Sequence, residues 1–233
     1  MKTKLICTLG PSSMKADVIH QMKSRGVSLF RINMSHTKIS DLEDILTKLS
    51  KYDINICIDT EGCQVRTGFL GTNSLILKEK SSVKIYGNSI TCNENNIYIR
   101  PKDALNELKD GDILSIDFNS VMLKAVDTST YSSQGYVNCE VIIGGPIGNN
   151  KGIAIIDKKI ELPNFSKKDK KAIELSKKFK IKSFTLSFIN NAAAVREFKS
   201  MYNANSDIYA KIETREGIQN FEEIMEKSLD FVN

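Results

Sequence analysis

The stretch IYAKIETREGIQNFEEIMEKS, residues 208–228, decides the fold class of this sequence. Its first six residues alternate as a strand does, and the alternation turns Lys211 and Glu213 toward the same face. A helix is predicted from Gly217 to Ser228, directly after this strand. A strand that leads straight into a helix is the repeating unit of parallel β/α proteins.

The same alternation of short apolar strands and helices recurs toward the N-terminus, on both sides of a central segment. The helix that begins at Ser40 opens with the pattern Ser40-x-x-Glu43, which predicts a capping box. Strands are predicted at 5–9, 27–33, 54–60, 183–188, 208–213 and 229–233, and helices at 16–24, 40–52, 166–179, 191–202 and 217–228.

Between residues 69 and 160 the sequence changes to short Val- and Ile-rich runs separated by Gly, Asn, Ser and Pro, which predicts an inserted β-rich domain. Without these 92 residues, 141 of the 233 remain for the β/α part, whereas a complete eight-unit barrel needs on the order of 200 to 250. The α/β part, residues 1–68 and 161–233, is therefore an unfinished barrel or an open doubly wound sheet, and periodicity alone leaves both open. A barrel that stops at its sixth strand is expected to leave two sheet edges for another polypeptide to cover.

Composition narrows the function classes. The net charge of +5 comes from 33 basic and 28 acidic residues, and no basic stripe studded with aromatic residues accompanies it, so nucleic-acid binding is not expected. The apolar run at the N-terminus is too short for a signal peptide and no run reaches about 18 apolar residues, so we expect a cytoplasmic protein without a membrane span. The five cysteines form no CxxC pair, which predicts buried free thiols.

Charged and polar residues gather where the predicted strands end. The loops that follow parallel strands meet at one mouth, so these residues are expected to face a common site. They are Arg31, Asn33 and Ser35 in FRINMSH, Asp59, Thr60 and Arg66 in IDTEGCQVRTG, and Lys211 and Glu213 in AKIE.

Such a set suits a phosphate- or carboxylate-bearing substrate, because guanidinium and ammonium groups bind these anions. Its carboxylates, with hydroxyl and amide oxygens beside them, can hold Mg²⁺ or a monovalent cation, whereas two histidines are too few for a typical zinc site. The same residues could instead form structural ion pairs, Lys211 with Glu213 and Arg31 with Asp59.

The motifs KLICTLGPSS, FRINMSH, IDTEGCQVRTG, LSFINNAAAVREF and AKIETREGIQNFEEI occur in the order found in pyruvate kinases, and the whole chain resembles that family. The resemblance implies an incomplete TIM barrel with an inserted small β-barrel lid (B) domain at 69–160. The chain stops before the second magnesium ligand, the last barrel strands and the C-terminal domain of the family, so the resemblance makes it either one piece of a longer protein or a shortened relative.

The activity implied by the resemblance is phosphoryl transfer from phosphoenolpyruvate to ADP, which gives pyruvate and ATP in glycolysis. Lys211 and Arg66 match the residues that act on the transferring phosphoryl group. Arg31 and Ser187 match further substrate-binding positions. The alternative is a catalytically impaired relative that binds phosphorylated ligands or a partner chain, and another chemistry on the same scaffold, such as an aldolase-like reaction, is also compatible with it.

The resemblance also implies two cations, Mg²⁺ at Glu213 and K⁺ at Asn33, Ser35, Asp59 and the backbone oxygen of Thr60. The partners it implies are phosphoenolpyruvate and ADP or ATP, with homo-oligomers in a full-length protein or a second chain that completes the barrel. One departure lies next to the potassium ligands. The family pattern DTKGPEIRTG reads DTEGCQVRTG here, so Glu61 takes the place of a lysine.

Overall fold

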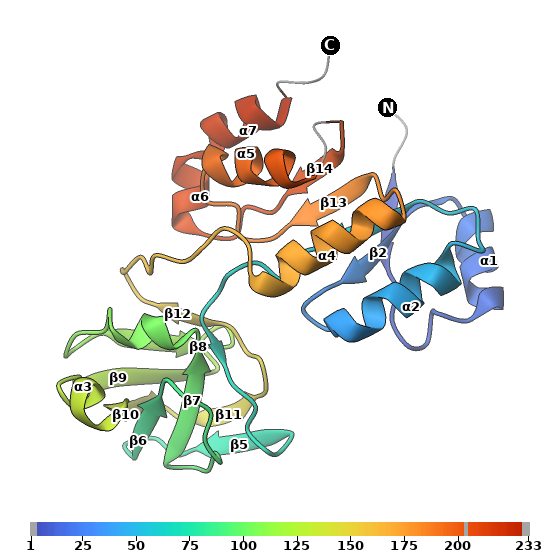
Figure 1. Ribbon diagram of the computed structural model, residues 1–233. Coiled ribbons are helices and arrows are strands. Elements are labelled where there is room, and N and C mark those ends of the chain that lie inside the picture. The colour runs from blue at the N-terminus through green and yellow to red at the C-terminus, as the bar shows by residue number, and fades with distance from the viewer. Residues whose placement is uncertain (1–3, 203–204, 230–233) are drawn as a thin grey trace. The chain divides into compact units, whose positions relative to one another are not determined.

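The structure is a computed structural model that describes residues 4–202 and 205–229. The chain divides into two compact units, one formed by residues 1–63 with 163–233 and the other by residues 64–162. Figure 1 shows the helices and strands of both.

The first unit is built on a five-stranded parallel sheet. Its strands are β1 (Leu5–Thr8), β2 (Val27–Asn33), β3 (Ile56–Asp59), β13 (Ser183–Leu186) and β14 (Asp207–Ala210). They lie in the order β1-β2-β3-β13-β14, and all four neighbouring pairs are parallel. A doubly wound sheet reverses its strand order partway, whereas a barrel adds each strand next to the preceding one. The order therefore confirms an incomplete β/α barrel.

Helices cover one face of this sheet and share a core with it (Figure 1). The helices that contribute to this core are α1 (Ala16–Ser24), α2 (Ile39–Leu49), α4 (Lys167–Lys178), α5 (Ala192–Met201) and α7 (Phe221–Leu229). A short helix, α6 (Arg215–Gln219), precedes α7. The sheet contributes Phe30, Ile32 and Ile58 to this core, and the helices contribute the side chains that pack against them. Because side chains alternate along a strand, Arg31 and Asn33 lie on the opposite face from Phe30 and Ile32.

Helix ends agree with the sequence signals at some positions and differ at others. The capping box predicted at Ser40 is wrong, because α2 begins at Ile39 and its N-cap is Lys38, which places Ser40 inside the first turn. The Ser40 hydroxyl bonds to Asp41 instead. A capping box does form at α4, where Ser166 and Asp169 bond reciprocally. The predicted helix at 217–228 is broken at Asn220 into α6 and α7.

The second unit is a β structure that closes on itself. Its strands are β4 (Arg66–Thr67), β5 (Ser74–Leu77), β6 (Ser82–Tyr86), β7 (Asn96–Arg100), β8 (Ile113–Ile116), β9 (Val121–Asp127), β10 (Tyr136–Ile143), β11 (Gly145–Gly148) and β12 (Ile153–Ile155), with the 3-10 turn Lys102–Leu105 and the helix α3 (Thr130–Gln134). Seven of them form a sheet in the order β12-β8-β9-β10-β6-β7-β4, while β5 and β11 pair separately.

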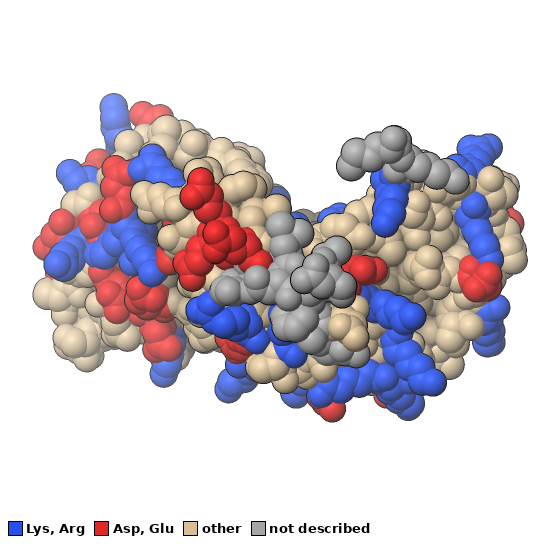
Figure 2. Space-filling view, turned by 90° about the horizontal axis from the view of Figure 1, so that it is seen from above, with Lys and Arg blue, Asp and Glu red and all other residues tan. Residues whose placement is uncertain are grey.

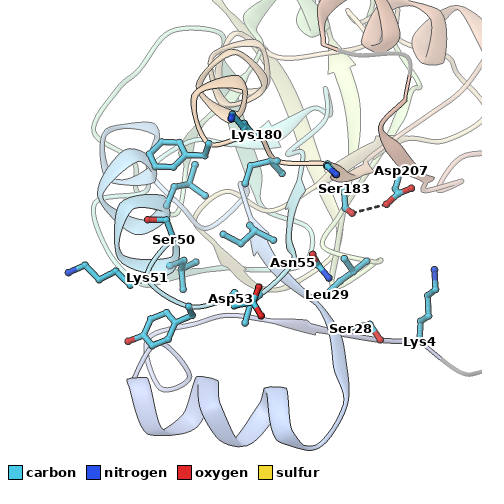
Figure 3. Close-up of a pocket in the computed structure, with 18 of the residues that line it drawn as sticks. Lys4, Ser28, Leu29, Ser50, Lys51, Asp53, Asn55, Lys180, Ser183 and Asp207 are labelled. Carbon is cyan, nitrogen blue, oxygen red and sulfur yellow. Dashed lines mark hydrogen bonds between the residues drawn. The ribbon is translucent and has the colours of Figure 1, made fainter.

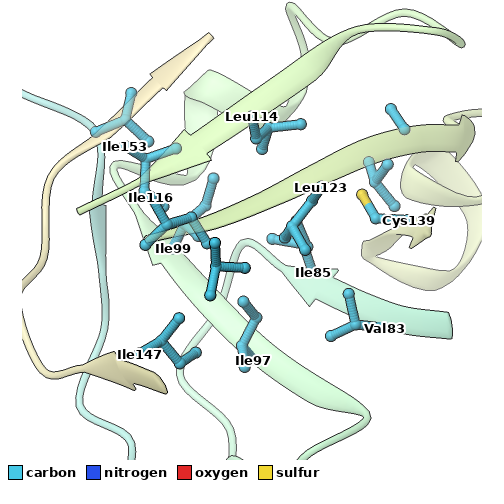
Figure 4. Packing of buried hydrophobic residues seen from close by; sticks show 14 of the residues in the cluster. Val83, Ile85, Ile97, Ile99, Leu114, Ile116, Leu123, Cys139, Ile147 and Ile153 are labelled. Atoms are coloured by element: carbon cyan, nitrogen blue, oxygen red, sulfur yellow. The ribbon is translucent and has the colours of Figure 1, made fainter. Parts of the chain in front are cut away.

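Hydrogen bonds between the two ends of the seven-stranded sheet complete the ring. Ile153 N donates to Val65 O at 2.7 Å and Thr67 N donates to Lys151 O at 2.8 Å. The interior is almost entirely aliphatic and includes Ile97, Ile99 and Leu123 (Figure 4). Closure removes the exposed sheet edges that an open sheet of this size would have.

Three further predictions concern the cysteines, the strand at 229–233 and membrane spans. All five cysteines are free thiols, and Cys57, Cys92 and Cys139 are buried as predicted, whereas Cys7 and Cys63 are only half-buried. The predicted strand at 229–233 lies outside the described residues except for Leu229, which ends α7. Among the helices that the structure describes, none is both long and apolar enough to cross a membrane. Basic and acidic side chains are intermixed over most of the face seen in Figure 2.

Candidate functional site

The strand register of the first unit brings the predicted site residues to one edge of the sheet. Asn33 of β2 is the register partner of Asp59 at the end of β3, and Asp59 is the partner of Thr185 in β13. Lys211 follows the last residue of β14 directly. All these positions lie at the carboxyl ends of parallel strands, where β/α proteins place their chemistry.

Asp59 is the centre of this cluster and is almost completely buried. Its Oδ1 accepts a hydrogen bond from the Thr185 hydroxyl at 2.8 Å and lies 3.1 Å from Lys211 Nζ. Its Oδ2 lies 3.4 Å from an Arg31 terminal nitrogen. Arg31 Nε in turn donates to the Thr8 hydroxyl at 2.8 Å. Burying a carboxylate is costly unless it is paired, and Asp59 is paired with both predicted anion-binding cations.

Glu213 lies beside this cluster and is more exposed. Its Oε1 is 3.9 Å from Lys211 Nζ, and its Oε2 accepts the backbone N–H of Phe188 at 3.0 Å. The structural ion pairs considered from the sequence, Arg31 with Asp59 and Lys211 with Glu213, are thus both present. They do not exclude a ligand, because Arg31 and Lys211 each keep about 30% of their side-chain surface exposed.

Thr60 and Ser187 are tied together between β3 and β13. Ser187 N donates to the Thr60 hydroxyl at 2.9 Å, and the Ser187 hydroxyl donates to Thr60 O. Gly62 has φ +70°, and a Cβ there would lie 2.8 Å from the ring of Phe188 and 3.0 Å from Ser187. Glycine is therefore required at position 62 both for the backbone conformation and for this close approach.

The last residue of β2 and the loop after it provide the other two predicted potassium ligands, Asn33 and Ser35. Asn33 Oδ1 accepts the backbone N–H of Ser35 at 2.8 Å, and Asn33 O accepts the Thr37 hydroxyl at 2.9 Å. Met34 N donates to Asp59 O at 2.9 Å, which fastens this loop to the end of β3. Asn33 and Ser35 consequently stay close to Asp59.

Arg66 belongs to the second unit, so its relation to Arg31 and Lys211 stays a prediction. Within that unit Arg66 of β4 is the backbone register partner of Arg100 in the antiparallel strand β7. Its guanidinium donates to Asn150 O at 3.0 Å. It also bridges to Gly152 at the point where the sheet closes.

Sequence reasoning missed four residues that shape the site. Thr185 holds Asp59 and Thr8 holds Arg31, while Lys168 and Asp169 at the start of α4 bind the loop after β3. A signal existed for Thr185, because alternation in SFTLSF places it on the same face as Ser183 and Ser187. None existed for the α4 pair, which is about 100 residues away from its partners in the sequence.

Burial raises the pKa of three groups around the site, Cys57, Cys63 and Asp169. Burial raises the pKa of the Cys57 thiol to about 11, an effect that hydrogen bonding with Thr185 partly offsets. Burial also raises the pKa of the Cys63 thiol to about 12, with Asp169 and Glu61 adding to it. The pKa of Asp169 is raised by burial, against the hydrogen bonds that its carboxylate accepts. Both thiols are therefore neutral at physiological pH and poor nucleophiles.

The oxygen donors fit the two cations to different degrees. Asn33, Ser35, Asp59 and Thr60 offer hydroxyl, amide, carboxylate and backbone oxygens on two adjoining loops, which suits a hard monovalent cation. For Mg²⁺ the described residues offer Glu213, and no group of three His, Cys, Asp or Glu side chains is arranged to hold a metal in residues 4–202 and 205–229. Because Mg²⁺ is commonly held by one or two carboxylates together with substrate phosphates, Glu213 fits a partial site.

An open pocket of about 730 Å³ lies at the opposite end of the same sheet (Figure 3). Ser28, Ile56, Ser183 and Asp207, which lie at the beginning of their strands, contribute to its lining. Ser183 donates to Asp207 at 3.2 Å within it. This pocket is separate from the predicted site, which occupies the carboxyl ends of the strands.

Strand order and the inserted β unit define a class of protein, a β/α-barrel domain interrupted by a closed β insertion. The family can be named as well. Residues 1–232 match the family model described as "Pyruvate kinase, barrel domain", and the chain belongs to that family.

Curated relatives agree with this assignment. Pyruvate kinase of Staphylococcus haemolyticus is 27% identical over 97% of this chain, and those of Staphylococcus epidermidis and Staphylococcus aureus are 26% identical over the same share. The chain spans about 40% of the length of each of these relatives.

Proposed function

We propose that this chain carries the phosphoenolpyruvate-binding part of a pyruvate kinase site and acts in phosphoryl transfer from phosphoenolpyruvate to ADP, giving pyruvate and ATP. The observation that supports the proposal is the convergence of Arg31 and Lys211 on one buried carboxylate, Asp59, at the carboxyl edge of the sheet. Glycolysis in the cytoplasm is the setting proposed for this activity.

Lys211 and Arg31 would bind the substrate by exchanging partners. In the absence of ligand, each cation is neutralised by Asp59. Phosphoryl and carboxylate oxygens of the substrate compete for the same donors, and the exposed part of both side chains lets them do so. Charge placed in advance where the transferring phosphoryl group develops its own is the main source of catalysis in such reactions. Arg66 and Ser187 are proposed as further contacts.

The proposed metal ligands are Glu213 for Mg²⁺ and Asn33, Ser35, Asp59 and Thr60 for K⁺. Held by Glu213, Mg²⁺ would supply positive charge that stabilises the phosphoryl group during transfer. Hydrogen bonds within the chain orient these ligands: the backbone N–H of Phe188 holds Glu213, and the Ser187 hydroxyl holds the backbone oxygen of Thr60. The donor oxygens are therefore in place before a ligand arrives.

A second candidate function is binding without turnover. It is favoured by the internal neutralisation of the cluster, in which Asp59 and Glu213 balance the charges of Arg31 and Lys211. Such a relative would bind phosphorylated ligands or a second chain. Among the described strands, β1 and β14 each pair on one side only, so a partner chain, or further copies in an oligomer, could cover these edges.

One experiment separates the candidates. The purified chain is assayed for pyruvate formation with phosphoenolpyruvate, ADP, Mg²⁺ and K⁺, and phosphoenolpyruvate binding is measured by titration calorimetry. Lys211→Met tests the site, and Lys23→Met, which removes an exposed lysine paired with Asp53, is the matched control. Turnover that only Lys211→Met abolishes supports the kinase, and binding without turnover supports the second function. Absence of both binding and turnover refutes the kinase and the ligand-binding form of the second function.

A further inference from the structure

The four proposed potassium ligands lie at the ends of two neighbouring strands and on the loops that follow them, and one side chain connects these loops. Asn33, the last residue of β2, and Ser35 flank Met34, while Asp59, the last residue of β3, and Thr60 directly precede Glu61. Lys168, in the first turn of α4, donates from its Nζ to Met34 O. The same Nζ lies 3.2 Å from Glu61 Oε2.

The helix that presents Lys168 is itself anchored to the second loop. Asp169 accepts the backbone N–H groups of Glu61 at 2.7 Å and of Gly62 at 3.1 Å. Its carboxylate also closes the capping box with Ser166. Since Asp169 is fully buried, the start of α4 is fixed against the loop that carries Thr60.

Charge compensation explains why this link is made with a lysine. Glu61 and Asp169 place two carboxylates in a largely buried environment, with exposed fractions of 6% and 0%. Such burial is costly unless cations or hydrogen-bond donors compensate it. Lys168 supplies a positive charge to Glu61 and a hydrogen-bond donor to the neighbouring loop at the same time. Glu61, at the position where the family pattern has a lysine, is thus a partner of Lys168.

We infer that Lys168, acting with Glu61, is a positioning residue that fixes the distance between the two loops and thereby tunes the proposed monovalent-cation site. The inference rests on the proposed function, because it concerns the potassium ligands of that site. Residues outside the ligand shell that orient metal ligands commonly change metal affinity by 10- to 100-fold when they are removed. Lys168 contacts the Met34 carbonyl oxygen and the Glu61 carboxylate, so its effect must reach the proposed ligands through these two neighbouring residues.

The test uses the full chain and its potassium response at constant ionic strength, with tetramethylammonium as the balancing cation. The potassium concentration for half-maximal effect is measured on phosphoenolpyruvate binding and, where present, on pyruvate formation. Thallium(I), a spectroscopic substitute for potassium, is titrated directly by nuclear magnetic resonance without substrate. Lys168→Met is compared with Lys168→Arg and with Lys170→Met, which removes a lysine of the same helix that pairs with Glu197.

The expected result is an increase of about 10-fold in the half-maximal potassium and thallium concentrations for Lys168→Met. Values for Lys168→Arg and Lys170→Met stay within about twofold of those of the unmodified chain, and the response at saturating potassium is retained. Glu61→Gln, which preserves size, is expected to shift the same constants in the same direction and serves if Lys168→Met does not fold.

An unchanged potassium constant in both Lys168→Met and Glu61→Gln overturns the inference while leaving the proposed function intact. An equal shift in Lys170→Met also overturns it, because the effect would then be one of charge on α4 in general. If the unmodified chain responds to neither potassium nor phosphoenolpyruvate, the proposed function fails and the inference fails with it.

Discussion

The two units of this chain differ in whether they bury charged side chains. The second unit, residues 64–162, closes its sheet around aliphatic side chains, and the only polar residues buried in it are Thr67 and Ser115 among those the structure describes. The first unit buries Asp59, Glu61 and Asp169 near the carboxyl end of one strand. Each of these carboxylates has a cation or backbone N–H groups as partners.

Because of this difference, the aliphatic core of the second unit is expected to contribute mainly to stability, and the ion cluster of the first unit mainly to ligand binding and activity. An aliphatic core stabilises a unit through burial and close packing, and nothing in it can bind a charged ligand. A buried ion cluster contributes little net stability but keeps charges in fixed positions. Variants of the two regions should therefore affect different measurements.

The largest effect is expected from Lys211→Met. Loss of one preorganised charge at a reacting group typically lowers kcat by about 10²- to 10³-fold, and the upper end is expected here because Lys211 contacts both Asp59 and the proposed magnesium ligand Glu213. Asp59 keeps Arg31 and Thr185 as partners, so the melting temperature should change by only a few degrees. Turnover and thermal unfolding of the same preparation test this, and a large loss of stability with retained activity would reverse the comparison.

The converse effect is expected from Leu123→Ala in the closed β unit. Leu123 is fully buried in the aliphatic core, and truncation of a buried leucine costs about 2–5 kcal/mol. Denaturant unfolding should show this loss, whereas phosphoenolpyruvate affinity of the folded protein should stay within about twofold. Lys124→Ala, at the exposed neighbouring position of β9, is the matched control and should be close to neutral.

Most of the fold could be predicted from the sequence because local patterns determine it. The strand at 27–33 and the helix at 16–24 end where apolar periodicity and turn residues indicate. The choice between barrel and doubly wound sheet could not be made this way, since both repeat the same local unit. Strand order, which depends on long-range pairing, decides it.

The site was predictable in part for a similar reason. Strand alternation and the family motifs indicated Arg31, Asp59 and Lys211, and the register brings them together. Lys168 and Asp169 were not predicted, because their importance depends on where α4 begins relative to a loop far away in the sequence. The family pattern marked Glu61 only as a departure, and the structure gives it a partner.

A smaller effect is expected in the alkylation rates of two buried thiols, one in each unit. Burial raises the pKa of Cys57 in the first unit from 9.0 to about 11, and that of Cys139 in the second unit to about 12. At pH 8 the thiolate fraction of Cys57 is then about 100-fold lower than that of an ordinary thiol. Neither residue should be alkylated in the folded chain, and both should react in denaturant. Mass spectrometry at intermediate denaturant concentrations identifies the unit that opens first, and rapid alkylation of either thiol in the native chain would contradict the buried positions.

The smallest effect concerns two serines at the start of two helices in the first unit. Ser166 accepts the Asp169 N–H at 3.0 Å and donates to the Asp169 carboxylate at 2.8 Å, so Ser166→Ala removes a helix cap and one donor from a buried charge. Loss of an N-cap costs about 1 kcal/mol, although Asp169 retains the backbone N–H groups of Glu61 and Gly62.

Ser40→Ala is the matched control, because Ser40 lies in the first turn of α2 and makes no cap bond. Denaturant unfolding should show a loss near 1 kcal/mol for Ser166→Ala and a change below about 0.5 kcal/mol for Ser40→Ala. Equal losses would mean that the sequence pattern at Ser40 does act as a cap, and a loss well above about 2 kcal/mol at Ser166 would mean that Asp169 depends on this serine more than on the loop after β3.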